Sequence, residues 1–504
     1  ELAPYAADRL ALDLGTESAR PFLLKGWSAG DDWDAGRPFV WMERGQATLL
    51  LPAWSETSHV LTIASQAPAG AGSCRAELDG AGLGDWSPAP EWTPARFPRP
   101  AGGGRRGGGP MSRLDLALGR GAVVLLPLIF LILAWATLGH YGITWDEPEN
   151  FLSGDLYWRF FLSGDRALLD FEALKNRWAA SDERPYFYVY TFARQERYPP
   201  VANLVSAITG WLLGERAGWL NPIDAHHAAI PLFGAAGVLA VCLFAWGSRR
   251  RPAAVLVAGA CLSLFPLYWG QAHNNVKDVP LAALFALALW AGWRVFGGAP
   301  GARWKWTLAA GVLWGLALGV KANALVLPAI LLAWQIWLWA WPGFREWRRG
   351  RDWRGALLSG AAVLAAGGLT LLAVWPYLWA DPLRRLYQVF RYFAEVGREY
   401  RVFFEGQTYV AGQDLPGRYA LTHLILTTPL PTLILAGAGV VRAARESWRG
   451  ETSATALWLV WFVAALGRVS LPGMVIYNGL RQIMELLPAL CLLAGLGGEW
   501  LWEL

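Results

Sequence analysis

The chain has 504 residues, of which 55% are hydrophobic and only 16% are charged, and it contains 32 tryptophans. A soluble protein of this length carries more charge and lacks repeated apolar runs long enough to cross a bilayer, which takes roughly 20 residues each. The formal net charge of +5 is modest, and arginines cluster between apolar runs, which is typical of membrane topology and not of nucleic-acid binding. The composition therefore predicts a polytopic α-helical membrane protein.

Residues 1–98 differ in composition from everything that follows. They are polar, are punctuated by Gly and Pro, and contain alternating stretches such as ATLLLP and HVLTIAS, which favour strands. We expect a small β-sandwich-like domain or a fragment of one. Residues 99–112 form a Gly-, Arg- and Pro-rich linker, in which Met111 precedes a short basic segment and the first apolar run. The first domain is expected to belong to a fusion or to a neighbouring reading frame, and both origins stay open.

Residues 113–504 are expected to form an all-α transmembrane domain, incomplete at its C-terminus, with about ten or more helices. The predicted spans lie near residues 121–139, 226–246, 253–270, 280–296, 306–320, 324–341, 356–378, 424–441, 454–470 and 483–498. Basic clusters such as Arg249–Arg251 and FREWRRGRDWR fall on one side of this topology, which the positive-inside rule makes cytoplasmic. The outer side then contains residues 140–225, 271–279, 379–423 and 471–482.

Two segments of the outer side need a separate explanation. Residues 198–214 could pass for a further span, but a crossing there would send the later Arg clusters outside, so we expect a helix in the outer interface. Residues 379–423 carry six arginines on a face that should be poor in them. Either the topology is wrong there or these cations have a ligand. The segment DPLRRLYQVFRYFAEV predicts an amphipathic helix on the membrane, with Arg384 and Arg385 either binding a lipid phosphate or merely held by anionic headgroups.

The stretch GITWDEPENF, residues 142–151, places two adjacent carboxylates, Asp146 and Glu147, soon after the first predicted span. Ionisable groups beside hydrocarbon are costly, so such a pair indicates a functional site, although a hydrated acidic loop is the plain alternative. The segment QAHNNVKDVP adds His273, Lys277 and Asp278 on the same side. The outer face is therefore predicted to gather both acidic and basic groups.

Two further cations belong to this face. Lys321 lies in a short break between two spans, and Arg481 precedes the last one. Carboxylates and cations together suit a reaction on a phosphorylated lipid, because a carboxylate can deprotonate an attacking hydroxyl group and cations stabilise a phosphate leaving group. Each residue also has a structural alternative: Asp278 could cap the following helix, Lys321 could extend to the interface, and Arg481 could be an ordinary flanking charge.

Metal and redox chemistry are not indicated by the residues themselves. His226 and His227 are adjacent, so their side chains would point in different directions on a helix. The four cysteines have no metal-ligand spacing, and three of them fall within apolar runs. The cysteines are therefore expected to be small core residues.

Five segments follow one another along the chain: GITWDEPENFLSGDLYW, RYPPVANLVSAITGWLLG, QAHNNVKDVPLAALFAL, GLALGVKANALVLP and YNGLRQIMELLPAL. In this order they resemble motifs of the dolichyl- or polyprenyl-phosphate-mannose protein mannosyltransferases and of the related lipid A aminoarabinose transferases, within glycosyltransferase superfamily C. The first resembles the family's acidic loop, the second the segment that closes the first outer loop, and the third its second acidic motif. The resemblance covers about residues 115–500.

The resemblance implies transfer of a sugar from a polyprenyl-phosphate carrier on the outer face of the membrane. It makes Asp146 the catalytic base and Glu147 its acidic neighbour. It makes Asp278 a second acidic residue of the site, which orients the acceptor or a bound divalent cation.

The same resemblance implies substrate contacts by basic and aromatic residues. Lys321 and Arg481 would contact the carrier phosphate or the acceptor. Tyr477 and His273 are further expected contacts, although a loop histidine with no role is the structural alternative for His273. Lys277 departs from the family pattern, which has a small or apolar residue before the aspartate. It is expected either to contact phosphate or to pair with the aspartate.

The leading hypothesis is an inverting glycosyltransferase in the bacterial inner membrane, with its site facing the periplasm. Its expected partners are the bilayer, a polyprenyl-phosphate-linked sugar donor and an acceptor protein, lipid or glycan, with no nucleic acid; the sugar and the acceptor stay open. The alternative is a flippase or transporter of lipid-linked glycans, which should place its charges in mid-span along a path. A third hypothesis is a membrane-anchored scaffold with a carbohydrate-binding β-domain, in which Asp146 and Asp278 would lie far apart.

Overall fold

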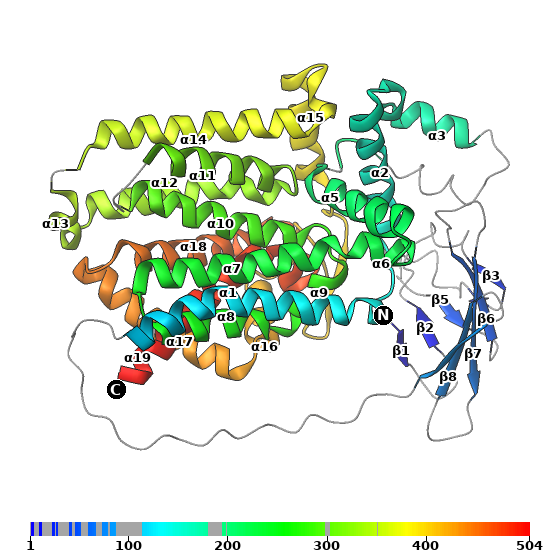
Figure 1. The fold of residues 1–504 in the computed structure, drawn as a ribbon, viewed down its shortest axis with the longest axis horizontal. Helices are drawn as coiled ribbons and strands as arrows, with labels where there is room; N and C mark the ends of the chain where they lie inside the picture. Colours follow the sequence, from blue (N-terminus) through cyan, green and yellow to red (C-terminus); the bar gives the residue numbers. More distant parts are fainter. Residues whose placement is uncertain are drawn as a thin grey trace. The chain divides into compact units, whose positions relative to one another are not determined.

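The computed structural model describes residues 113–179, 194–197, 199–297, 303–349 and 351–503, together with the backbone of nine strands within residues 1–86 (Figure 1). The predicted linker, residues 99–112, lies outside the described residues. The described chain divides into two compact units. Thr144–Leu152 belongs to the same unit as the N-terminal strands, whereas α2 from Ser153 onward belongs to the helical unit, and each unit is described by itself.

The N-terminal strands pair in two sheets. One has the order β1-β2-β5-β4 and the other the order β3-β6-β7-β8-β9, and all of these pairs are antiparallel. The strands are β1 Leu2–Pro4, β2 Leu10–Leu12, β3 Leu23–Lys25, β4 Trp27–Ser28, β5 Val40–Met42, β6 Gln46–Leu51, β7 His59–Gln66, β8 Ser73–Leu78 and β9 Ala81–Trp86. The predicted strand content is confirmed, and the packing of the two sheets as a sandwich stays a prediction.

Helices make up nearly all of the second unit. Its α-helices are α1 Arg113–Ala136, α2 Glu147–Ser163 (from Ser153 onward), α5 Val201–Thr209, α6 Pro222–His227, α7 Ala229–Arg249, α8 Pro252–Ser263, α9 Pro266–Asn274, α10 Asp278–Phe296, α11 Arg303–Leu318, α12 Val326–Ala340, α13 Arg345–Arg348, α14 Trp353–Val374, α15 Pro382–Glu395, α16 Tyr419–Thr427, α17 Leu430–Arg449, α18 Ser453–Ser470 and α19 Leu487–Glu503, whereas α3 Phe171–Ala179 belongs to the first unit. The short 3-10 helices are η2 Leu138–His140, η3 Arg166–Leu169, η5 Ala322–Leu325, η6 Pro342–Phe344, η7 Pro376–Trp379 and η8 Gly479–Leu486, and η4 Gly210–Arg216 is a π-helix. A hairpin of β10 Arg401–Phe404 and β11 Gln407–Val410 follows α15.

Seven helices of the described chain are long and apolar enough to cross a membrane, or nine if two bent pairs each count as one span. Ten spans were expected. The predicted span 306–320 corresponds to α11, which has only 16 residues. The two bent pairs are α8 with α9 and α16 with α17. Each bend has proline at the start of its second helix, Pro266 in α9 and Pro429 with Pro431 at the start of α17. The polytopic all-α architecture is confirmed.

Close backbone contacts hold the bundle together. A Cβ atom on Gly439 of α17 would lie 1.7 Å from the carbonyl oxygen of Leu493, and one on Gly497 of α19 would lie 1.9 Å from that of Leu435. Only glycine permits this approach, which brings α17 and α19 together as parallel neighbours whose C-terminal turns also meet, through Arg442, Glu499 and Glu503. Small residues at a helix interface are a usual means of association in membranes, where lipid removes the hydrophobic driving force.

Helices α7 and α10 run parallel, which defines two ends of the bundle. Gly237 of α7 faces Ala283 of α10, and ten residues further along both helices Gly247 lies against Trp293. Asp278, the first residue of α10, therefore lies at the end where α7 begins, and Arg249 lies at the opposite end. We call these the Asp278 end and the Arg249 end.

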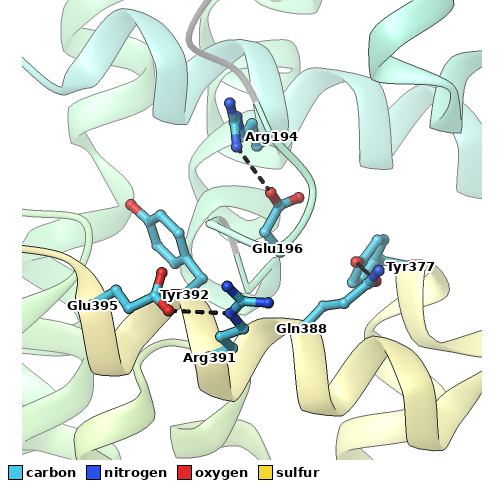
Figure 2. Close-up of a pocket in the computed structure, with 7 residues that line it drawn as sticks. All are labelled: Arg194, Glu196, Tyr377, Gln388, Arg391, Tyr392 and Glu395. Carbon is cyan, nitrogen blue, oxygen red and sulfur yellow. Dashed lines mark hydrogen bonds and ion pairs between the residues drawn. The ribbon is translucent and has the colours of Figure 1, made fainter.

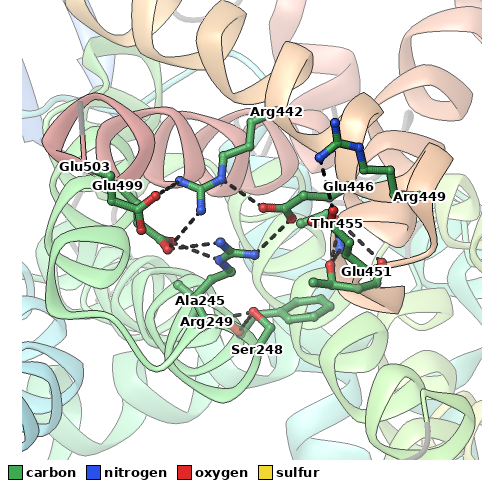
Figure 3. Close-up of polar contacts among 12 residues, drawn as sticks. Ala245, Ser248, Arg249, Arg442, Glu446, Arg449, Glu451, Thr455, Glu499 and Glu503 are labelled. Carbon is green, nitrogen blue, oxygen red and sulfur yellow. Dashed lines mark hydrogen bonds and ion pairs between the residues drawn. The ribbon is translucent and has the colours of Figure 1, made fainter. Parts of the chain in front are cut away.

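The Arg249 end contains a buried charge network that joins three helices (Figure 3). Arg249 of α7 contacts Glu446 of α17 and Glu499 of α19, each at 2.9 Å. Arg442 of α17 contacts Glu446 at 2.9 Å, Glu499 at 3.5 Å and Glu503 at 3.0 Å. Two guanidinium groups and three carboxylates thus tie α7 to the ends of α17 and α19.

Candidate active site at the Asp278 end

Asp278 is buried, with 4% of its surface exposed, at the start of α10. Lys277 occupies the N-cap position, and the side chain that bonds the N–H groups at this helix start is that of Asn275, whose Oδ1 accepts hydrogen bonds from the backbone N–H groups of Lys277 (3.0 Å) and Asp278 (2.8 Å). These are groups that a helix start leaves without an internal partner. The alternative expectation that the Asp278 side chain caps the helix is therefore wrong, and its carboxylate makes other contacts.

Two cations and an amide surround the Asp278 carboxylate. Lys321 Nζ lies 2.5 Å from Oδ1, and Arg481 Nε donates to Oδ2 at 3.2 Å. Asn275 Nδ2 also donates to Oδ2, at 2.8 Å. A buried carboxylate without such partners would be strongly destabilising. The structure therefore brings together three residues that the sequence placed on one face, from the break before η5, from α10 and from η8.

A second buried carboxylate, Glu485, lies in the same 3-10 helix as Arg481. It is fully buried, its Oε1 accepts hydrogen bonds from Arg468 and from Asn323 Nδ2 (3.1 Å), and its Oε2 has no hydrogen-bond partner among the described residues. Asn323 Nδ2 also donates to the carbonyl of Gln482 at 2.8 Å. Sequence reasoning missed Glu485, although a carboxylate that directly precedes an apolar run was a usable signal.

His273 has a different environment from the one expected. Its side chain is fully buried, with Nε2 at 2.9 Å from Thr137 Oγ1 and Nδ1 at 2.8 Å from the carbonyl of Trp269. The ring stacks on Tyr141, with 3.8 Å between centroids. The neighbouring Asn274 Nδ2 contacts the carbonyl of Gly142 at 3.5 Å. His273 thus packs against the segment that leads into the acidic stretch, and the substrate contact predicted for it gains no support.

From Thr144 onward, the acidic stretch belongs to the first unit. Asp146 directly precedes α2, which begins at Glu147. Glu147 is 1% exposed and accepts a hydrogen bond from Thr144 Oγ1 at 2.7 Å. Carboxylates in the first turn also interact favourably with the positive end of the helix dipole. The adjacent carboxylates therefore differ in position, one before the helix and one inside its first turn.

The remaining predicted contacts lie on neighbouring segments. The carbonyl of Tyr477 accepts a hydrogen bond from Tyr419 Oη at 3.2 Å, and its N–H donates to Gln482 Oε1 at 2.9 Å. Arg385 donates to the carbonyl of Tyr377 and lies over its ring, 4.8 Å from the centroid. Arg384 is exposed in the first turn of α15, where its backbone N–H is bound by the capping side chain of Asp381. The predicted helix is present as α15, and its position on the membrane and the phosphate contacts of its two arginines stay predictions.

A divalent cation near Asp146 and Asp278 is a further expectation from the sequence. Within the described ranges, no three His, Cys, Asp or Glu side chains come close enough to hold a metal ion. Asp278 already accepts from Lys321, Arg481 and Asn275, so a metal ion at this carboxylate would have to displace a cation. The arrangement suits an anionic ligand better than a metal.

A family model matches part of the helical unit. Residues 201–374, which include Asp278 and Lys321, match the family model described as dolichyl-phosphate-mannose-protein mannosyltransferase. The predicted resemblance is confirmed. No curated protein sequence gives a significant match to the chain.

The mannosyltransferase-like bundle also has a similar solved structure. This is the crystal structure of ArnT from Cupriavidus metallidurans bound to undecaprenyl phosphate, with a TM-score of 0.51 and 19% sequence identity. The alignment covers 75% of this chain and 60% of that one, so the chain spans about three fifths of the length of ArnT. At this identity the likeness establishes the fold.

Proposed function

We propose that this chain is an integral-membrane glycosyltransferase that transfers a sugar from a polyprenyl-phosphate carrier to an acceptor hydroxyl group. The observation that carries the proposal is the buried Asp278 carboxylate, which holds Lys321 and Arg481 together at one end of a mannosyltransferase-like bundle. The similar structure of ArnT is of a protein bound to undecaprenyl phosphate, which is a carrier of this class.

The charges of this cluster suit a phosphate group. Two cations face one carboxylate, so the three side chains together carry one excess positive charge. The Lys321 and Arg481 side chains are only 21% and 35% exposed, so their charges are partly shielded from water. Electrostatic interactions are stronger in such an environment than in water. We assign Asp278 the role of positioning these two cations, which would stabilise the carrier phosphate as it leaves.

The proposed transfer is a single displacement. The acceptor oxygen attacks the anomeric carbon of the sugar, and the bond from that carbon to the carrier phosphate oxygen breaks. The phosphate leaves with the electron pair, and the acceptor proton passes to a general base, for which Asp146 is our candidate on the sequence motif. The anomeric configuration is inverted because the attack and the departure occur on opposite faces.

The charge distribution supports an outward-facing reaction. Basic segments gather at the Arg249 end: the carbonyl of Gly297, just after α10, accepts hydrogen bonds from Trp347 and Arg351 of the loop FREWRRGRDWR. Cytoplasmic loops carry such an excess of arginine. We therefore propose that the Asp278 end faces away from the cytoplasm, and that the membrane is a bacterial inner membrane.

A flippase or transporter is the weaker hypothesis. Such a protein should carry charged groups at mid-span along its path. Here Asp278 begins its span, Lys321 precedes η5, and Arg481 lies in the first turns of the last candidate span. A cluster at the end of the bundle favours chemistry at the membrane face.

The test is sugar transfer in proteoliposomes from radiolabelled polyprenyl-phosphate sugars to a membrane extract as acceptor. Asp146→Asn should lower the transfer rate by about 10²–10⁴-fold, as expected for loss of a general base. Lys321→Gln should raise the donor concentration needed for half-maximal rate by about tenfold or more. Arg418→Ala is the matched control and should have no effect, because it removes an exposed ion pair between Arg418, on the loop after the hairpin, and Glu405, in the hairpin turn. Full transfer by both Asp146→Asn and Lys321→Gln would overturn the proposal.

A further inference from the structure

A polar pocket of about 320 Å³ lies at the Asp278 end, outside the cluster already described (Figure 2). Its walls are the polar face of α15, Tyr377 of η7 and the turn that contains Arg194 and Glu196. The volume falls within the range of small-molecule sites. The turn that contains Arg194 and Glu196 precedes α5 in the chain, and the first residue of α5, Val201, donates from its N–H to the carbonyl of Gly319 at 2.9 Å, two residues before Lys321.

The charged side chains that line the pocket pair with one another. Arg391 Nε contacts Glu395 Oε1 at 3.1 Å, and Arg194 Nη1 contacts Glu196 Oε1 at 3.7 Å. Figure 2 shows these two pairs on opposite sides of the pocket. A phosphate site presents an excess of positive charge, whereas here each of the two guanidinium groups in the lining has its own carboxylate. Arg197 and Arg385, which contact the two tyrosine rings, are not among the lining residues. The pocket therefore suits a neutral ligand with many hydrogen-bonding groups.

The types of polar group match a sugar ring. Carboxylates accept hydrogen bonds from hydroxyl groups, guanidinium groups donate to them, and an amide does both. Gln388 contributes the amide, and its Oε1 accepts a hydrogen bond from Tyr377 Oη at 2.9 Å. Alternating donors and acceptors along one wall fit neighbouring hydroxyl groups, each of which is both donor and acceptor.

Two tyrosine rings supply apolar surface in the same pocket. Arg385 lies over the ring of Tyr377, 4.8 Å from its centroid, and Arg197 lies over that of Tyr392, 5.3 Å away. Such cation–π contacts hold a ring in one orientation. An aromatic ring offers a flat apolar body for the C–H face of a sugar and a hydroxyl group at its edge.

The opposite face of α15 indicates the depth of the pocket in the membrane. Leu383, Leu386, Tyr387 and Phe390 follow the i, i+3, i+4, i+7 spacing of one helix face, and they are 83%, 45%, 64% and 63% exposed. An apolar face of this kind enters the boundary between headgroups and acyl chains. The pocket side of α15 then lies at the level of lipid headgroups.

We propose that this pocket binds a neutral sugar ring that serves as the acceptor of the transfer reaction. This inference rests on the proposed function, because it names the acceptor class for that reaction. Two sources share this chemistry, namely the sugar headgroup of a glycolipid and a free saccharide. The depth of the pocket favours the glycolipid.

The test measures binding of the full chain in nanodiscs, without transfer. Three probes are compared by native mass spectrometry: monoglucosyl diacylglycerol, phosphatidylglycerol and free maltose. The wild type should bind monoglucosyl diacylglycerol at least tenfold more tightly than phosphatidylglycerol. Gln388→Ala and Arg391→Ala should each weaken this binding by about tenfold, as expected for loss of hydrogen bonds to a ligand. Arg418→Ala is the matched control, because it also removes one exposed arginine from an ion pair, and it should leave binding unchanged.

The outcomes separate this inference from the proposed function. Lys321→Gln should weaken binding of undecaprenyl phosphate and leave glycolipid binding intact, and Arg391→Ala should do the reverse. Binding of maltose as tightly as the glycolipid would support a sugar site with a free saccharide as its source. Preference for phosphatidylglycerol, or unchanged glycolipid binding in both pocket variants, would overturn the sugar site while leaving the proposed transferase untouched.

Discussion

Replacement of Arg249 by alanine should destabilise the helical unit by about 3–5 kcal/mol, the range for removal of one partner of a buried ion pair. The side chains of Arg249, Glu446 and Glu499 are only 9%, 9% and 4% exposed. Without Arg249, both carboxylates depend on Arg442 alone, which already serves Glu503. The loss is therefore the cost of two buried carboxylates that share one guanidinium.

The assay is the free energy of unfolding in mixed detergent micelles, measured for the variant and for a matched control. Arg449→Ala is that control, because Arg449 pairs with Glu451 at 3.6 Å and both side chains are exposed, at 72% and 48%. Exposed pairs contribute about 0–1 kcal/mol. The double variant Arg249→Met with Glu499→Gln should recover part of the stability, because a buried pair can be replaced by uncharged groups at little cost. Equal losses for Arg249→Ala and Arg449→Ala would refute the reasoning.

Three further predictions concern stability. Gly439→Ala should lower the free energy of unfolding by about 1–3 kcal/mol, because the added Cβ would lie 1.7 Å from a carbonyl oxygen of α19 and overpack the interface. Gly437→Ala is its control: no atom lies within 4 Å of the added Cβ, so this variant should be neutral or stabilising in the same unfolding assay. The hydrogen bond from Arg418 lowers the pKa of Glu405 in the folded protein, so their pair should stabilise the protein at pH values above the pKa of Glu405 in the unfolded chain. This stabilisation should be lost as the pH falls through the pKa of Glu405 in the folded protein. The difference in unfolding midpoint between the wild type and Glu405→Gln should therefore shrink from pH 7 to pH 3, and a constant difference would contradict the prediction. Asn275→Ala should cost about 0.5–2 kcal/mol through loss of the cap of α10, and an unchanged unfolding midpoint would exclude that role.

The spans were predictable because they depend on long apolar runs, and their bends were not. Each of the ten expected runs has a helix at its place, but α8 and α9 meet at 59°, and α16 and α17 at 120°. The sequence signal for these bends is a proline within each run, Pro266 in 253–270 and Pro429 in 424–441, because the residue before a proline is disfavoured in a helix. Hydropathy averages over such single residues.

The gathering of Asp278, Lys321 and Arg481 was predictable from topology, because segments on the same side of a membrane meet at one end of a bundle. The particular hydrogen bonds and ion pairs that these residues make could not be predicted. The sequence offered Asp278 as a helix cap, whereas Asn275 has that role. Glu485 was missed because its partner Arg468 ends a different apolar run, and pairing across the bundle depends on helix rotation that hydropathy does not encode.

The capping of α10 by Asn275 separates two tasks that one aspartate at a helix start often performs together. Substitution of Asp278 by asparagine would remove a charge and leave the bonded N–H groups at the beginning of the helix in place. A loss of sugar transfer in that variant would then report on the electrostatics around the carrier, and a fraying of α10 would not be its cause. Because Asn275 bonds the N–H groups at the start of α10, the charge at position 278 can be changed without removing these hydrogen bonds.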